Sequence, residues 1–589
     1  MKEKKRIMRV LWIGMLGATL AAMSIFGLPK IDKVDIKNKE IVIAKSDLEL
    51  GETWADSVFK TMSLEEKVAQ LMVVRVRYND VSNQEYINFI KKYQFGGVCF
   101  FKGSPVKQIL LTNEIQNVSK IPLMVTFDGE FGPAMRLDSA LRFPSQMALG
   151  AIQNDELIYE MAAEFAHQFK AMGVHVNFAP VVDVNNNPKN PVINSRSFGE
   201  NPQLVAQKGL QYVRGLEENG IMSSLKHFPG HGDTETDSHH ALPVIKHSLE
   251  RLAQVEFYPF KYIIDKGVGS VMVGHLFVPA IDTTPNLASS LSPAFTQELL
   301  RKYFKYDGLV FTDGMEMKAM TNNRKPGEIE IKAILSDIDL LLLPPDPAVG
   351  HKKLVEAVND GTIPVETIDI KCLKVLREKE KWGIHKSEQV STDKIYNVLN
   401  SPKAKDLHER ISNATMTIIK NDNDILPIDF TQNKVASLVI GSGANNTFQK
   451  QLSLSGKISS YQLNKTTNAQ SGAATINKLK GHDLVVVGVF GLSDNPRNKY
   501  GLSAQTLNLL GALSKLENVV LVVFGNPYSL ANIQNLNNFN SILVAYHSTA
   551  VAQTSAAKAV LGLIDVDGKL PVSVNKDFPS GLGFDVKKK

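Results

Sequence analysis

The chain contains little cysteine and no marked excess of charge of one sign. Only two cysteines, Cys99 and Cys372, occur among 589 residues, which excludes a disulfide-rich framework and zinc-binding cysteine pairs. Both lie in apolar or helical stretches, so we expect a buried thiol at each position, while a single disulfide between them stays open. The net charge of +6 comes from 66 basic and 60 acidic residues spread over the whole length. That balance gives no indication of a nucleic-acid partner.

Phosphate-binding signatures and internal repeats are also missing from the sequence. No glycine-rich loop ends in the lysine of a P-loop. The stretch GSGANN, which begins at Gly441, has neither the complete glycine spacing nor the downstream acid of a dinucleotide site. It predicts a tight turn after a strand.

The N-terminus combines a basic region with an apolar run. MKEKKRIMR is followed by about 19 apolar residues at positions 10–28, which predicts an export signal within residues 1–30. A run of this length could also remain as a membrane anchor. In either case we expect the rest of the protein to work outside the cytoplasm, as a secreted, periplasmic or membrane-associated protein.

Between residues 50 and 385, short apolar runs alternate with helix-sized amphipathic segments. Ser63 and Glu66 have the spacing of a capping box, which marks the first of these helices. Eight strand candidates with helical sequence between them are typical of a (β/α)₈ barrel of the TIM type. The eight runs begin at Leu71, Gly96, Pro122, Gly173, Gly220, Gly267, Asp307 and Asp337.

A different pattern begins after residue 385. Residues 386–404 form a polar link, and residues 405–589 contain the hydrophobic runs VASLVI, DLVVVGV, NVVLVV and SILVAY between helical segments. This alternation predicts a second, sandwich-like α/β domain. The complete chain is therefore expected to be an α/β protein of two domains.

Polar residues gather where the barrel's strand candidates end. In a (β/α)₈ barrel the carboxyl ends of the strands share one face, and active sites lie on that face. We therefore expect these side chains to form a site. They are Asp128, Asp183, Lys226, His227, His275 and Asp313.

The stretch KHFPGHGDTETDSHH, residues 226–240, concentrates titratable side chains beside a Pro-Gly turn. Asp237 and His239 are two residues apart, so in an extended loop they lie on the same side and the carboxylate can hold the imidazole. Such a pair can donate and accept a proton near neutral pH. A zinc site that includes His231 with Asp237 or His239 is the alternative interpretation.

The stretch is similar to the signature of glycoside hydrolase family 3, and within it to the β-N-acetylglucosaminidase branch. Members of that branch carry KHFPGHG followed shortly by DSH. Further matching segments extend over nearly the whole chain after the N-terminal region. They are MSLEEKVAQLM, APVVDVNNNP, SRSFGENP, VMVGHLFVPAID, DGLVFTDGMEM and GKLPVSV.

The resemblance implies roles for individual residues. The family's nucleophile corresponds to Asp313, and the acid/base to His239 with Asp237 as its partner. No metal and no organic cofactor is implied, and the partner is a carbohydrate. The implied sugar-binding residues are Asp128, Arg136, Arg196, Lys226 and His227.

The implied activity is exo-acting, retaining hydrolysis of terminal β-linked N-acetylglucosamine from peptidoglycan fragments or chito-oligosaccharides. The resemblance to family 3 β-glucosidases is weaker, because in those enzymes the second domain supplies a glutamate as acid/base. No obvious glutamate occurs at the loops of the second domain here, so we expect that domain to be mainly structural. A β-glucosidase, a β-N-acetylglucosaminide phosphorylase and a non-catalytic glycan-binding protein are the alternatives.

Overall fold

The computed structural model describes residues 48–76, 83–235, 242–322, 324–430, 433–443 and 446–589. The predicted signal or anchor within residues 1–30 lies outside them. Among the residues that the structure describes, no helix combines the length and apolar character needed to span a bilayer.

Eight parallel strands form the first sheet, in the order β7-β6-β5-β4-β3-β2-β1-β8. The amide of Thr312, at the end of β7, donates to the carbonyl of Leu340 just before β8, which brings the two ends of the sheet together. Each apolar run expected to form a strand contains one, so the predicted barrel is confirmed. The strands are β1 (Met72–Arg75), β2 (Gly97–Phe100), β3 (Met124–Phe127), β4 (Val176–Asn177), β5 (Met222–Phe228), β6 (Ser270–Val273), β7 (Leu309–Thr312) and β8 (Leu341–Leu342).

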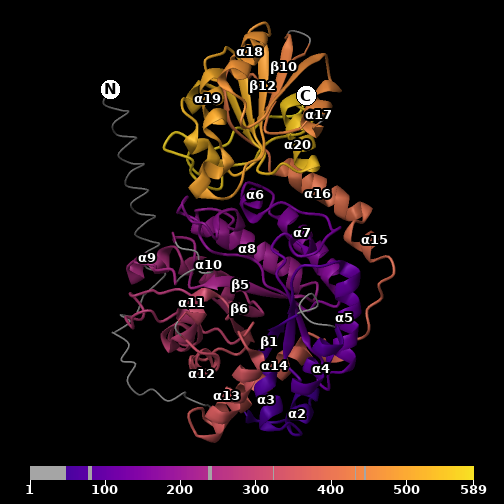
Figure 1. Cartoon of the computed structure of the whole chain (residues 1–589), viewed down its shortest axis with the longest axis vertical. Coiled ribbons are helices and arrows are strands. Elements are labelled where there is room, and N and C mark those ends of the chain that lie inside the picture. The colour runs from indigo at the N-terminus through magenta and orange to yellow at the C-terminus, as the bar shows by residue number, and fades with distance from the viewer. Residues whose placement is uncertain (1–47, 77–82, 236–241, 323, 431–432, 444–445) are drawn as a thin grey trace, which may run out of the picture. The chain divides into compact units, whose positions relative to one another are not determined.

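Helices surround these strands (Figure 1). Ser63 and Glu66 form the predicted capping box at the start of α3, and α5 and α8 each begin with a capping side chain followed by proline. The main helices of this layer are α2 (Trp54–Phe59), α3 (Leu64–Gln70), α4 (Asn83–Tyr93), α5 (Pro105–Asn117), α6 (Gln146–Gly150), α7 (Glu156–Lys170), α8 (Pro202–Glu217), α9 (Leu249–Gln254), α10 (Phe257–Ile264), η5 (Ala294–Tyr303), α11 (Lys318–Thr321), α12 (Glu328–Leu335), α13 (Pro347–Asn359) and α14 (Val365–Lys381).

The barrel interior is closely packed. Every residue of β5, the longest barrel strand, is buried, as expected of a parallel strand covered on both faces. Cys99 on β2 and Cys372 on α14 are buried free thiols, so the expectation of buried thiols is confirmed and the disulfide alternative is excluded.

The second domain contains a six-stranded sheet in the order β11-β10-β12-β13-β14-β9. All neighbours are parallel except β14 and β9. The four predicted runs form β10 (Val435–Ile440), β12 (Leu484–Val489), β13 (Val519–Val523) and β14 (Ser541–Val544), which are fully buried.

The two edge strands of this sheet were not predicted from the sequence; they are β9 (Thr417–Asn421) and β11 (Ile458–Leu463). An edge strand is covered less completely, and β11 alternates between half-buried and exposed positions, so no continuous apolar run marks it. The helices linking and covering the sheet are α15 (Ile395–Leu399), α16 (Pro402–Ala414), α17 (Thr447–Ser453), α18 (Ala469–Leu479), α19 (Ala504–Leu513) and α20 (Ala550–Leu561).

A fully buried lysine lies at the amino-terminal end of the barrel. Lys379 of α14 donates to Gln70 Oε1 at 2.7 Å and to the carbonyl of Pro122 at 2.8 Å. Both acceptors are neutral, so they do not offset the cost of burying an ammonium. Burial therefore lowers the pKa of Lys379 to about 7.

This lysine makes the stability of the barrel depend on pH. Between pH 7 and the ordinary lysine pKa near 10, the unfolded chain holds a proton at Lys379 that the folded protein has lost. The free energy of unfolding therefore rises with pH in this window, by up to about 1.4 kcal/mol per unit. We expect Lys379→Met to reduce this rise, as measured by urea unfolding at pH 7, 8 and 9 with the fluorescence of Trp54 and Trp382 as the signal. Lys352→Met, at an exposed lysine, is the control, and parallel pH curves for wild type and Lys379→Met would contradict the expectation.

Candidate active site at the carboxyl face of the barrel

The predicted site residues come from the carboxyl ends of neighbouring parallel strands. Asp128 directly follows β3, Lys226 and His227 are among the last residues of β5, and Asp313 directly follows β7. Strand β5 continues to Phe228 and therefore carries Lys226 and His227 itself. Both side chains therefore lie on a fully buried strand.

Two carboxylates and a lysine form the centre of the site. The ammonium of Lys226 lies 2.9 Å from Asp128 Oδ1 and 2.9 Å from Glu130 Oε1. Burial alone would lower the pKa of Lys226, but the two carboxylates outweigh this effect and raise it. The side chains of Lys226 and Glu130 are only 2% exposed, so the lysine is a fixed cation.

Two arginines extend this charged network. Arg196 binds Glu130 in a bidentate manner with one edge of its guanidinium, Nε to Oε2 at 3.0 Å and Nη2 to Oε1 at 2.7 Å. Arg136 pairs with Asp128. Burial would raise the pKa of Glu130, but Arg196 and Lys226 hold it well below its usual range. Asp128, Arg136 and Arg196 keep about a fifth to a quarter of their side chains exposed, so their polar groups remain accessible to a ligand.

Glu130 was not among the predicted site residues. It lies in FDGEF two residues after Asp128, and its carboxylate joins Lys226 to Arg196. Tyr212 of α8 fixes the same segment by donating its hydroxyl to the carbonyls of Gly129 and Glu130. The only sequence signal for Glu130 was its closeness to Asp128 at a strand end.

Asp183 orients His227. This fully buried carboxylate lies 2.8 Å from His227 Nδ1 and also accepts the backbone N–H of His231 at 2.6 Å. Burial would raise the pKa of Asp183, but the charge and hydrogen bond of His227 lower it. An ionised carboxylate accepts only, so Nδ1 of His227 carries a proton, while Nε2 lies 3.3 Å from Arg196 Nη2.

Asp313 is a partly exposed carboxylate at the end of β7. Its Oδ1 accepts the backbone N–H of Gly314 at 2.7 Å. Burial would raise its pKa, but the charges of His227 and His275, together with the Gly314 hydrogen bond, lower it to about 2. Asp313 is therefore an ionised carboxylate throughout the neutral range, with one oxygen held in place.

The predicted dyad of Asp237 and His239 lies outside the described residues. The chain on either side of it is tied down by polar contacts. Asn190 donates to the carbonyls of His231 and Gly232 at 2.9 Å, and His247 lies 2.6 Å from Asp233.

The zinc alternative is not tested, because Asp237 and His239 lie outside the described residues. Within the part of the chain that the structure describes, no group of three or more His, Cys, Asp or Glu side chains could hold a metal ion. His231, the histidine weighed as a ligand, contacts Thr234 Oγ1 through Nδ1 at 2.8 Å. Burial lowers the pKa of His231 to about 4.

A cavity of about 300 Å³ borders this face at the ends of β1 and β8. Its wall includes Arg75, Tyr86 and Glu316, and Glu316 follows Asp313 by three residues, at most about 11 Å along the chain. This volume is at the lower end of the range for small-molecule sites. The carboxyl face thus combines an ionised carboxylate, fixed hydrogen-bond donors and acceptors, and an adjoining hollow, an arrangement suited to a polyhydroxylated ligand with an electrophilic carbon.

Comparisons with known proteins cover both domains. Residues 63–378 match the glycosyl hydrolase family 3 N terminal domain, and residues 416–583 match the glycosyl hydrolase family 3 C-terminal domain. Beta-hexosaminidase A of Pseudoalteromonas piscicida is 27% identical over 559 residues, 83% of this chain and 91% of that protein. Beta-hexosaminidase LpqI of Mycobacterium tuberculosis is 31% identical over 333 residues, 54% of this chain and 83% of that protein.

Solved structures are similar over most of the chain. A glycoside hydrolase family 3 beta-N-acetylglucosaminidase from Paenibacillus sp. str. FPU-7 is 29% identical with a TM-score of 0.74, covering 87% of this chain and 99% of that chain. A beta-glucoside phosphorylase, BglX, is 21% identical with a TM-score of 0.76, covering 90% and 97%. At that identity the likeness to BglX shows the fold alone.

The buried Glu130 carboxylate gives a prediction about stability. Glu130→Gln leaves the charges of Lys226 and Arg196 without their shared partner, so we expect the free energy of unfolding to fall by about 3–5 kcal/mol. The control is Glu66→Gln, whose partner Lys120 is 71% exposed and whose replacement still completes a capping box. That change should cost less than about 1 kcal/mol. Thermal unfolding of both variants measures the difference, and equal shifts would show that the network does not stabilise the fold.

Proposed function

The chain belongs to glycosyl hydrolase family 3, and on that premise we propose that it removes terminal β-linked N-acetylglucosamine from glycans with retention of configuration. The observation that carries this proposal is the ionised, partly exposed Asp313 beside the network of Lys226 and Arg196. The names of the similar beta-hexosaminidases support the choice of sugar.

In the first step an Asp313 oxygen attacks the anomeric carbon while the bond from that carbon to the leaving oxygen breaks. His239 gives its proton to the leaving oxygen, and a covalent glycosyl-aspartate is formed. The low pKa of Asp313 keeps it ionised for this attack. The hydrogen bond from Gly314 occupies Oδ1, so Oδ2 is the atom proposed to attack.

In the second step water attacks the same carbon from the face that the leaving group vacated. His239, now neutral, takes a proton from the water, and the bond to Asp313 breaks. Two inversions give net retention. Asp237 holds the His239 imidazole and stabilises its protonated form.

The charged network is proposed to bind the hydroxyls of a single terminal sugar. Arg136, Arg196 and Lys226 donate hydrogen bonds, while Asp128 accepts them. Because these groups are already paired with one another, they need little reorganisation when the sugar binds. A site whose groups bind one terminal sugar favours exo cleavage, the release of single sugars from the end of a glycan.

The substrate class follows from the expected export of the protein. The apolar run at residues 10–28 supports a location outside the cytoplasm, where peptidoglycan fragments or chito-oligosaccharides are available. Comparing the two classes as substrates, and fractionating cells that produce the protein, would test this part of the proposal.

The first test is release of p-nitrophenol from its β-N-acetylglucosaminide and its β-glucoside by the full-length protein. We expect the acetamido sugar to be preferred, with kcat/KM reduced by at least about a thousandfold in Asp313→Asn and by about a hundredfold or more in His239→Ala. Asp307→Asn is the matched control, because Asp307 lies exposed at the opposite end of β7. The first-formed product should be the β-anomer, read by proton NMR.

Other outcomes would point to different functions. Preference for the glucoside, or full activity of His239→Ala, would place the proton donor elsewhere and indicate a β-glucosidase. Formation of a sugar 1-phosphate in phosphate buffer would indicate a phosphorylase, since a histidine acid/base does not repel phosphate as a carboxylate would. Binding without turnover would indicate a glycan-binding protein.

A further inference from the structure

The barrel segment of residues 183–200 carries both Asp183 and Arg196, and side chains of the second domain bind it at several points. Tyr528 donates its hydroxyl to the carbonyl of Asn185 at 3.1 Å, and Tyr500 donates to the carbonyl of Pro188. At the other end, Ser573 donates its backbone N–H to Glu200 Oε2 at 2.8 Å. The segment is thus held by partners more than 300 residues away in the sequence.

The contact nearest to Arg196 is made by Asn526. Its amide nitrogen lies 2.5 Å from Asn194 Oδ1 and 3.1 Å from Asp494 Oδ1, and its own Oδ1 accepts the N–H of Tyr528 at 3.0 Å. Asn526 is 4% exposed and Asn194 is 3% exposed. Breaking a hydrogen bond between two buried amides costs free energy, because each amide would be left with neither a hydrogen-bond partner nor access to water.

Asn194 begins the short helical turn η3 (Asn194–Arg196). Its φ of +41° lies in the left-handed region, which is uncommon for residues other than glycine, although asparagine enters it more readily than most. Its amide nitrogen donates to the carbonyl of Asn190 at 3.1 Å, so the side chain is held from both sides. Two residues later the same turn projects Arg196 onto Glu130.

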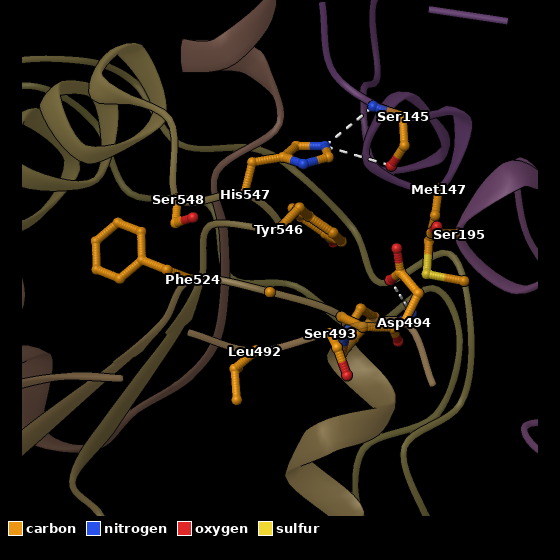
Figure 2. Close-up of a pocket in the computed structure, with 13 residues that line it drawn as sticks. Ser145, Met147, Ser195, Leu492, Ser493, Asp494, Phe524, Tyr546, His547 and Ser548 are labelled. Atoms are coloured by element: carbon orange, nitrogen blue, oxygen red, sulfur yellow. Dashed lines mark hydrogen bonds between the residues drawn. The ribbon is translucent and has the colours of Figure 1, made fainter. Parts of the chain in front are cut away.

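Asn526 stands at the edge of the second sheet where α/β folds usually bind ligands, the carboxyl ends of parallel strands. Residues following β12, β13 and β14 line a polar cavity of about 120 Å³ there, together with Ser145 and Ser195 of the barrel. Figure 2 shows the His547 imidazole directed at Ser145 on one side of this cavity and Asp494 on the other. Ser195 immediately precedes Arg196, so this edge of the second domain faces the turn that carries the arginine.

We propose that Asn526 is a positioning residue of the sugar site, acting through Asn194 to hold the turn that aims Arg196 at its ligand. The second domain therefore takes part in substrate binding without supplying a group to the reaction. This inference rests on the proposed function only in taking the ligand of Arg196 to be a sugar.

The test variant is Asn526→Ser in the full-length protein. Serine keeps an oxygen for the Tyr528 N–H but loses the amide donor to Asn194. We expect KM to rise by about tenfold while kcat changes by less than about threefold, because Arg196 binds substrate and transition state alike. Asn540→Ser is the matched control, since Asn540 binds the Val519 N–H at the opposite end of β13 and should leave KM unchanged.

A double-mutant cycle with Arg196→Lys separates positioning from general stability. If Asn526 acts through Arg196, Asn526→Ser should change KM by less than about twofold in the Arg196→Lys background. The same tenfold rise in both backgrounds, or no rise in the wild-type background, would overturn the proposal. Where turnover is too slow to measure, equilibrium binding of N-acetylglucosamine gives the same comparison. If Asn526→Ser does not fold, Asn526→Asp replaces it, and we expect that variant to raise KM likewise.

The KM and kcat of each variant are expressed as ratios to the wild-type values, measured on whichever β-glycoside the wild-type protein cleaves fastest. A failure of the proposed sugar preference would therefore appear in the wild-type activities. A failure of the positioning inference would appear only in the ratios.

Discussion

The Glu130 carboxylate, buried between Lys226 and Arg196, is the interaction on which the arrangement of the carboxyl face depends. Burying the charge of Glu130 or Lys226 without a partner of opposite charge would cost a large amount of free energy. The two cations offset the burial of Glu130, and Glu130 in turn pairs with each of them. The three residues come from the segment after β3, from β5 and from the segment after β4. A single buried carboxylate thereby fixes three parts of the barrel relative to one another.

Burial and the surrounding charges also give neighbouring carboxylates different roles. Asp183 is fully buried, and its oxygens are occupied by His227 and by the His231 backbone. Asp313 is kept ionised by nearby positive charge but remains partly exposed. Glu130 and Asp183 therefore serve the geometry of the site, whereas Asp313 has the access that a reacting group needs.

The sequence predicted most of the barrel because its parallel strands are buried on both faces and appear as apolar runs that end in polar residues. Asp128, Lys226 and Asp313 could be predicted as site residues because they stand at strand ends. Glu130 could not be predicted, because its importance comes from Arg196, 66 residues away along the chain. The strands β9 and β11 could not be predicted either, because their edge positions require no continuous apolar run. The contacts of Asn526 depend on how two domains meet, which the sequence does not reveal.

The contact between Asn194 and Asn526 spans 332 residues of sequence, and this separation bears on when the protein matures during its synthesis. At roughly 5–20 residues per second, the ribosome reaches Asn526 on the order of tens of seconds after Asn194. The barrel's own strands are complete before then, yet the turn bearing Arg196 still lacks its partner. A chain that ends before Asn526 would thus contain all eight barrel strands, but the proposed sugar site would be incomplete until the C-terminal third of the polypeptide is made.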